Sequence, residues 1–266
     1  MSDDPILFDV SDKVLTITLN NPSKLNPIAD DMTFPAIGRL GDAVRNPGIG
    51  AIVVTGAGRA FCAGGDVSSM GGTDPSGQPQ TFERSVDHQR ERHLFPYLLH
   101  TIPKVTIAAV NGHAVGAGLG IAASCDLRFS STKGKFGTAF ANVGLGGDFG
   151  TTWQLTRLLG ESKAKELFFL PEIIDAQEAL RIGLVNRVLP EESFSEDVHE
   201  LAARIAKGPL VSYRWMKQNV NQSSVSDFMT MLEKEAVTHL RCGQTEDHKE
   251  GVAAFMEKRT ADFRGL

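Results

Sequence analysis

The stretch AAVNGHAVGAGLGIAASCDLRFS, residues 108–130, places a run of small residues between two apolar segments. Residues 104–111 (KVTIAAVN) form a continuous apolar run that predicts a buried strand, and residues 127–131 (LRFSS) predict another. Small side chains in the intervening loop let a ligand approach the backbone closely. Backbone N–H groups exposed at such a loop can hold an anionic oxygen.

A second apolar run also ends in a loop of small residues. Residues 51–56 (AIVVTG) predict a buried strand, and AGRAFCAGGDV follows at 57–67. Two N–H groups that converge from the two loops would form an oxyanion hole. Tight turns and close helix packing are the alternative explanation for one such loop. A dinucleotide site is disfavoured, because Ile121 replaces the last residue of the GxGxxG motif and Asp126 follows too soon.

The rest of the chain predicts mixed strands and helices to about residue 190 and helices alone afterwards. A strand is expected at 13–19, and Pro96 should kink or break the helix predicted at 82–100. Helices or helix-containing segments are also expected at 30–44, 153–160, 162–170, 176–190, 197–206, 209–220, 224–241 and 246–258. Strands in close pairs argue against a TIM barrel and favour an α/β core, residues 1–200, with a helical region at 201–266.

Composition limits the class of protein. The chain has 266 residues, 41% hydrophobic and 22% charged, which suits one large globular unit. A net charge of −5 gives no reason to expect nucleic-acid or membrane binding. Cys62, Cys125 and Cys242 form no CxxC pair, so neither a metal site nor a disulfide framework is expected, and free thiols fit a reducing compartment. The N-terminus has no signal-peptide pattern and no apolar run reaches ~18 residues, so a cytoplasmic location is expected.

Several spaced motifs resemble the enoyl-CoA hydratase/isomerase family, also called crotonases. The resemblance rests on GAGRAFCAGGDV, residues 108–130, KFGTAFANVGLGGDFGTTWQLTRLLG, EALRIGLVNRVLP and the terminal EGVAAFMEKRTADF. It implies an α/β fold, a spiral of ββα units with a C-terminal helical trimerisation region. It also implies an acyl-CoA thioester as the substrate, no separate cofactor, no metal, and a homotrimer or a hexamer.

The resemblance also assigns candidate site residues. The N–H groups of Gly65 and Ala117 resemble the oxyanion hole of the family. Lys24, Phe255 and Lys258 resemble residues that hold coenzyme A, the last two often across a subunit boundary. The remaining candidates for substrate or coenzyme A binding are Leu25, Ala63, Gly64, Asp66, Val67, Gly116, Phe140, Gly144 and Leu145.

Hydratases of this family use two glutamates, and their positions are occupied here by Gly120 and Phe140. Neither side chain can transfer a proton, so ordinary hydratase activity is disfavoured. Asp148 stands where family members that lack these glutamates carry an acid. The pattern is most similar to the epoxyphenylacetyl-CoA isomerases and the Δ3-Δ2-enoyl-CoA isomerases. Asp148 would shuttle a proton between two carbons of the acyl group.

Asp148 also has other interpretations. It could cap the helix that follows it. If it is buried instead, its pKa is expected to rise above ~3.9, which would suit a proton shuttle. In 4-chlorobenzoyl-CoA dehalogenases of the family the same position holds a nucleophile, and His93 falls where their histidine activates water. Arg92 and Phe140 stand where those enzymes have tryptophans, and His93 in HQRERH could be a surface residue.

A non-catalytic family member that only binds is the third alternative. Some crotonase-like chains have lost catalysis and bind RNA, but this acidic chain has no visible basic stripe. Both glycine loops and Asp148 are present, which favours an enzyme.

Overall fold

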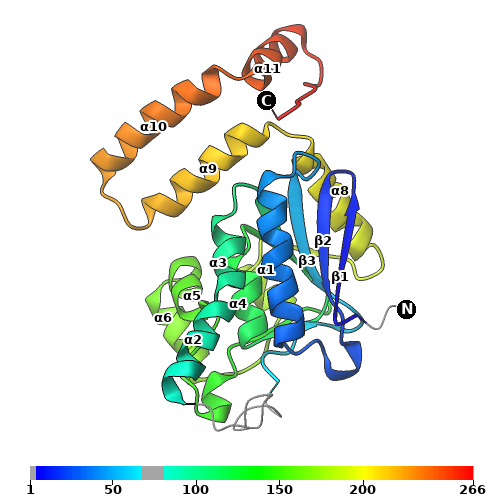
Figure 1. The fold of residues 1–266 in the computed structure, drawn as a ribbon, viewed down its shortest axis with the longest axis vertical. Coiled ribbons are helices and arrows are strands. Elements are labelled where there is room, and N and C mark those ends of the chain that lie inside the picture. The colour runs from blue at the N-terminus through cyan, green and yellow to red at the C-terminus, as the bar shows by residue number, and fades with distance from the viewer. Residues whose placement is uncertain (1–3, 67–80, 266) are drawn as a thin grey trace.

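A computed structural model describes residues 4–66 and 81–265 (Figure 1). Its main sheet has the strand order β1-β2-β3-β5-β7-β10. The β1–β2 pair is antiparallel and every other neighbouring pair is parallel. The strands are β1 Ile6–Ser11, β2 Val14–Leu19, β3 Ala51–Gly56, β5 Val105–Val110, β7 Leu127–Ser131 and β10 Arg187–Leu189. The strands predicted from the apolar runs are confirmed, whereas β1 was not predicted.

A second, smaller sheet pairs the short strands that follow the main ones. Its order is β4-β6-β8-β9, with bounds β4 Ala60–Cys62, β6 His113–Val115, β8 Lys135–Gly137 and β9 Ile174–Asp175. Strands β4, β6 and β8 follow β3, β5 and β7 within a few residues. The close strand pairs expected from the sequence are therefore present as β3–β4, β5–β6 and β7–β8, although the three-residue strands were not located individually, and β3, β5 and β7 each lead into the same small sheet.

The helices of the core lie where the sequence predicts them, except α4, whose residues were interpreted as part of a loop of small residues. They are α1 Asp30–Arg45, α2 Phe82–Arg92, α3 Leu94–Thr101, α4 Ala117–Ser124, α5 Thr151–Leu159, α6 Glu161–Phe169, α7 Ala176–Arg181 and α8 Phe194–Ala206, with 3₁₀ turns η1 Pro22–Lys24 and η3 Phe140–Val143. The expected break in the helix at 82–100 is confirmed. It falls at His93, so that Pro96 lies in the first turn of α3, where its missing N–H is harmless.

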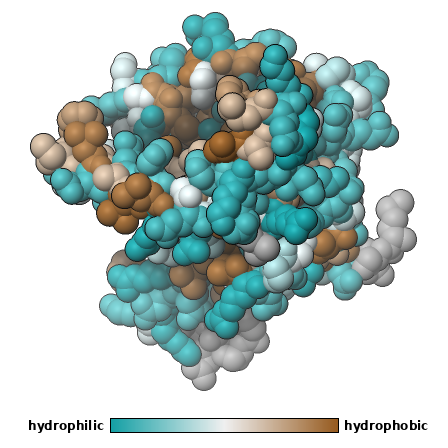
Figure 2. Space-filling model, turned by 90° about the horizontal axis from the view of Figure 1, so that it is seen from above, coloured by the Kyte–Doolittle hydropathy of each residue, from teal (hydrophilic) through white to brown (hydrophobic). Residues whose placement is uncertain are grey.

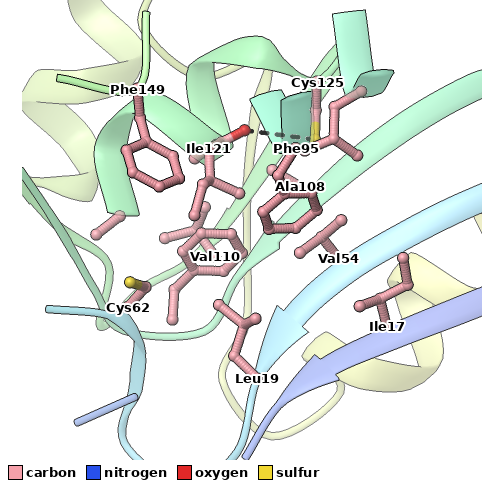
Figure 3. Close-up of a cluster of buried hydrophobic side chains, with 14 of the residues drawn as sticks. Ile17, Leu19, Val54, Cys62, Phe95, Ala108, Val110, Ile121, Cys125 and Phe149 are labelled. Carbon is pink, nitrogen blue, oxygen red and sulfur yellow. Dashed lines mark hydrogen bonds between the residues drawn. The ribbon is translucent and has the colours of Figure 1, made fainter. Parts of the chain in front are cut away.

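Helix α4 lies at the centre of the core, and all eight of its residues are buried. Figure 3 shows Ile121 of this helix in one hydrophobic cluster with Phe95, Val110 and Phe149. Cys125 belongs to the same cluster, and its Sγ–H donates to the Ile121 carbonyl at 3.7 Å. The loop that carries Phe149 is therefore anchored directly against α4.

The three cysteines are free thiols, as the sequence predicts. Burial raises the pKa of Cys62 to about 11 and that of Cys125 to about 12. Both thiols therefore stay protonated near neutral pH and act as small core residues.

Three C-terminal helices extend from the core as an arm: α9 Leu210–Ser223, α10 Phe228–Gly243 and α11 Glu246–Glu257 (Figure 1). Figure 2, which looks onto this end of the molecule, shows hydrophobic side chains on the surface. Exposed apolar residues of the arm include Val220, Val225, Phe228, Met229, Leu240, Val252, Phe255 and Met256.

The division of the chain at residue 200 into an α/β core and a helical region remains a prediction. Within the described residues, no helix is long and apolar enough to span a membrane.

Candidate active site

The two glycine loops meet at the edge of the small sheet. Strands β4 and β6 are parallel neighbours, so the loops that follow them leave the sheet together. Gly64 and Gly116 have φ values of +105° and +55°, which favour glycine. A Cβ on Gly116 would lie 3.8 Å from the Gly64 Cα, and a Cβ on Gly64 would lie 3.9 Å from the Ala117 nitrogen. Both distances are ordinary van der Waals contacts, so the two loops pack against each other, and the positive φ values rather than a lack of space favour glycine.

Within the part of the chain that the structure describes, two backbone N–H groups beside this contact have no backbone acceptor. Ala117 is the first residue of α4, so its N–H has no carbonyl partner within the helix. Gly65 forms a parallel bridge with Ile28, whose N–H donates to the Gly64 carbonyl at 2.7 Å. In residues 4–66 and 81–265, the Gly65 N–H has no acceptor. Both N–H groups are therefore available to an acceptor oxygen of a ligand.

Asp148 lies at the centre of a hydrogen-bonded cluster. The His93 Nε2 is 2.6 Å from Asp148 Oδ1, and the Gln89 Nε2 donates to Oδ1 and Oδ2 at 2.8 and 2.7 Å. The Phe149 N–H donates to Oδ1 at 2.8 Å. The Asp148 side chain is 29% exposed. The carboxylate is therefore held in place while part of it still reaches open space.

The structure contradicts the helix-cap interpretation of Asp148. The residue that caps α5 is Gly150, and the Asp148 side chain does not accept from the helix. It is the Asp148 carbonyl that accepts from the Thr151 N–H and hydroxyl, at 3.0 and 2.7 Å. The carboxylate is thus left for the cluster with His93 and Gln89.

The expected rise in the pKa of Asp148 is wrong. Burial does raise the pKa of this carboxyl, but hydrogen bonds from His93, Gln89 and the Phe149 N–H lower it more. The net pKa is below the ordinary value, because donors that stabilise the charged form outweigh desolvation. Asp148 is therefore an ionised carboxylate at neutral pH.

The two positions where the resemblance expects glutamates are closed by packing. A Cβ on Gly120 would lie 2.6 Å from the Thr151 Oγ1 and 2.7 Å from the Phe149 carbonyl oxygen. Phe140 is buried and stacks on Phe168, with ring centroids 6.1 Å apart. Neither position provides a proton carrier.

Arg92 connects the acid cluster to the first glycine loop. Its Nη1 donates to the Gln89 Oε1 at 3.3 Å, and its Nη2 donates to the Ile28 carbonyl at 3.1 Å. Its guanidinium also lies over the Phe149 ring, 5.6 Å from the centroid. Sequence reasoning missed Gln89. The available clue was its spacing of four from His93, which places both on one helical face.

Most of the other predicted residues lie along the first loop. The Lys24 Nζ is 3.7 Å from the Asp66 carboxylate, and the Leu25 carbonyl accepts from the Ala63 N–H at 3.0 Å. Buried Asn26, another residue that the sequence did not single out, donates to three carbonyls of residues 57–61 and fixes this arrangement. Val67 lies outside the described residues.

The remaining predicted residues are more distant or exposed. Gly144 ends η3 with φ of +69°, and Leu145 beyond it is 46% exposed. Phe255 is 82% exposed on α11 and Lys258 follows that helix. In Figure 1, α11 lies at the far end of the molecule from α2. The structure of one chain therefore does not bring Phe255 and Lys258 to the glycine loops.

Comparison with known proteins identifies the class. The family model for enoyl-CoA hydratase/isomerase matches residues 9–265, and the chain belongs to this family. A putative enoyl-CoA hydratase from Streptomyces coelicolor A3(2) has a similar structure, with a TM-score of 0.92, 31% identity, and coverage of 98% of this chain and 94% of that one. The predicted crotonase-type α/β fold is confirmed.

Similar relatives have been named for different reactions. The 1,2-epoxyphenylacetyl-CoA isomerase of Escherichia coli (strain K12) is 34% identical over 98% of both chains. The short-chain-enoyl-CoA hydratase of Clostridium acetobutylicum is also 34% identical, over 96% of this chain and 95% of its own. Overall sequence similarity therefore does not decide between an isomerase and a hydratase, and the reaction has to be inferred from the residues of the site.

Proposed function

We propose that this protein is an acyl-CoA isomerase that moves a double bond through a thioester enolate. The proposal rests on which positions of the candidate site carry an acidic side chain. Asp148 is ionised and partly open, whereas Gly120 and Phe140 supply no acid. A shift of one proton between two carbons needs one carboxylate, whereas water addition usually uses two proton carriers.

The N–H groups of Gly65 and Ala117 would stabilise the enolate. The thioester oxygen accepts both hydrogen bonds, and these strengthen as negative charge develops on that oxygen. Asp148 takes a proton from the acyl chain and returns it two carbons away, so that a C3–C4 double bond becomes a C2–C3 double bond. Its lowered pKa keeps the carboxylate ionised and free to accept a proton, although it also makes Asp148 a weaker base than a carboxylate with a raised pKa would be.

The test is a substrate panel on the wild type and on Asp148→Asn. The panel contains 3-enoyl-CoA and 2-enoyl-CoA, with products followed by mass and absorbance. We expect conversion of 3-enoyl-CoA without a gain of water, and loss of this conversion in Asp148→Asn. Hydration of 2-enoyl-CoA that survives the substitution would mean that other groups perform the chemistry.

A second candidate reaction is favoured by the 2.6 Å contact between His93 and Asp148. Here Asp148 attacks the ring carbon of 4-chlorobenzoyl-CoA, chloride leaves, and an aryl ester forms on the carboxylate. His93 then takes a proton from water, and the resulting hydroxide hydrolyses the ester and frees Asp148. Chloride release that is lost in both Asp148→Asn and His93→Gln would support this reaction over isomerisation. A protein that binds acyl-CoA without turnover would fit neither reaction.

We also propose that the arm joins subunits into a homotrimer or a dimer of trimers. The apolar residues of α9–α11 support this, because they are exposed and the described residues of one chain do not cover them. Phe255 and Lys258 would then reach coenzyme A held by Lys24 of a neighbouring subunit. Light scattering should give three or six times the chain mass of 28.7 kDa, and a monomer would contradict it.

We also propose a cytoplasmic location, which the free buried thiols support. No cofactor beyond the thioester is proposed.

A further inference from the structure

The side-chain amide of Gln89 lies within hydrogen-bond distance of both Asp148 and His93. Its Nε2 lies 2.8 and 2.7 Å from the two oxygens of Asp148 and 3.3 Å from the His93 Nε2. Nearly equal distances place the amide nitrogen midway between the carboxylate oxygens. Gln89 therefore restricts rotation of the carboxylate about its last bond, which a single hydrogen bond would not do.

The orientation of the Gln89 amide is fixed from its other end. The Arg92 Nη1 donates to Oε1 at 3.3 Å, and a guanidinium can only donate. A flipped amide would turn its NH₂ toward Arg92 and its oxygen toward a carboxylate, so both contacts would repel. Because Arg92 is itself bonded to the Ile28 carbonyl, Gln89 is positioned relative to the loop that carries Gly65.

The amide also suits both positions of the proton between His93 and Asp148. With the proton on Nε2, the ring donates to Oδ1 and Gln89 donates to the carboxylate. With the proton on Asp148 Oδ1, that oxygen donates to Nε2, and Gln89 still donates to the other carboxyl oxygen, Oδ2. One side chain thus keeps the carboxyl group oriented before and after proton transfer.

We propose that Gln89 is a positioning residue that orients the Asp148 carboxyl group beside His93, both when the carboxyl group is ionised and when it carries a proton. The inference rests on the proposed role of Asp148. Gln89 needs no contact with the substrate, since it acts through Asp148.

The pKa of Asp148 depends on which charged groups lie near it. His93 and Arg92 approach from α2 and its end, with Asp30 and His88 beyond Arg92. Helix α4 has no ionisable side chain, and Arg157 of α5 stacks on Trp153. Since the hydrogen bond from Gln89 helps to lower the pKa of Asp148, its removal should raise that pKa. As the pH is lowered, activity that needs the ionised carboxylate should then be lost at a higher pH than in the wild type.

The experiment compares Gln89→Leu and Gln89→Glu with the wild type in the isomerisation of 3-enoyl-CoA. The matched control is Gln177→Leu, at an exposed position on α7. We expect kcat to fall about 10- to 100-fold in Gln89→Leu with little change in KM, because the carboxylate is misplaced. The acid limb of kcat against pH should move to higher pH, and further in Gln89→Glu, where a like charge faces Asp148. The control should change neither.

A second measurement does not depend on turnover. Thermal unfolding of Gln89→Ala, Asp148→Ala and the double variant should be non-additive, with a Tm loss in the double variant smaller than the sum of the single losses. Additive losses with an unmoved acid limb would overturn the inference. If Asp148→Asn is inactive and Gln89→Leu is normal, only the inference fails. If Asp148→Asn is fully active, the proposed function fails, and the unfolding cycle still shows whether the two side chains are coupled.

Discussion

The candidate active site has two walls of opposite chemistry. The packed wall consists of Gly116, Gly120, Phe140 and Phe149, which leave little space and carry no ionisable group. The polar wall consists of Gln89, Arg92, His93 and Asp148, which are joined by hydrogen bonds. The walls touch where Phe149 follows Asp148 in the chain.

The two walls are held together by different physical forces. In the packed wall, side chains fill the space where the family resemblance expects glutamates. Substitutions in this wall should therefore change the free energy of unfolding. In the polar wall, charge and hydrogen bonds hold one carboxylate, so its changes should appear in catalysis and in pH dependence.

The largest expected effect concerns the polar wall. Asp148→Asn keeps the size of the side chain but removes the proton carrier, and kcat for 3-enoyl-CoA should fall roughly 10²- to 10⁴-fold. Steady-state kinetics would measure this, with exposed Asp42→Asn on α1 as the control. A loss of less than tenfold would mean that the polar wall does not carry the reaction.

The packed wall should respond in stability. Phe140→Ala removes a buried ring that stacks on Phe168, and the free energy of unfolding should fall by about 3 kcal/mol. Urea denaturation measures the change. Phe82→Ala provides the control, because Phe82 is 78% exposed and its loss should cost less than about 0.5 kcal/mol. Equal effects would show that Phe140 is not part of a packed wall.

A smaller effect is expected at Gly120. Gly120→Ala forces a methyl group against Thr151 and Phe149, which should cost about 1–3 kcal/mol of unfolding free energy. Gly38→Ala in α1 is the matched control. A Cβ there meets open space, so the better helix propensity of alanine should stabilise by up to about 1 kcal/mol.

Gly120→Glu extends the same comparison to function. Restoring the acid at this position should not create hydratase activity, since the side chain has no space beside Phe149. Hydration of 2-enoyl-CoA by this variant would show that the packed wall can open.

The smallest expected effect is the pH dependence of stability. The pKa of Asp148 is lowered in the folded state, so its contribution to stability is present above the unfolded value of ~3.9 and is lost as pH falls through the lower folded value. Thermal unfolding between pH 7 and pH 3 should therefore show a smaller acid-induced decrease of Tm in Asp148→Asn than in the wild type. An identical decrease in both proteins would contradict the lowered pKa.

Features that depend on residues close together in the chain could be predicted from the sequence alone. Apolar runs located β3, β5 and β7, helical periodicity located α1 and the helices of the arm, and the glycine loops marked where the backbone must be bare. The motifs around these elements also pointed to the family and to Asp148. Strands of three residues, such as β4 and β6, were missed because they are too short to show a period.

The protonation state and the free space of the site could not be predicted in this way, because they depend on residues that folding brings together. Gln89 and His93 lie 59 and 55 residues from Asp148 in the chain, yet their hydrogen bonds outweigh burial and reverse the expected direction of its pKa shift. Likewise, Phe149 closes the space beside Gly120 only because its loop packs on α4. A pKa and a free volume are sums over all groups in contact, and the folded chain chooses those groups without regard to their distance in sequence.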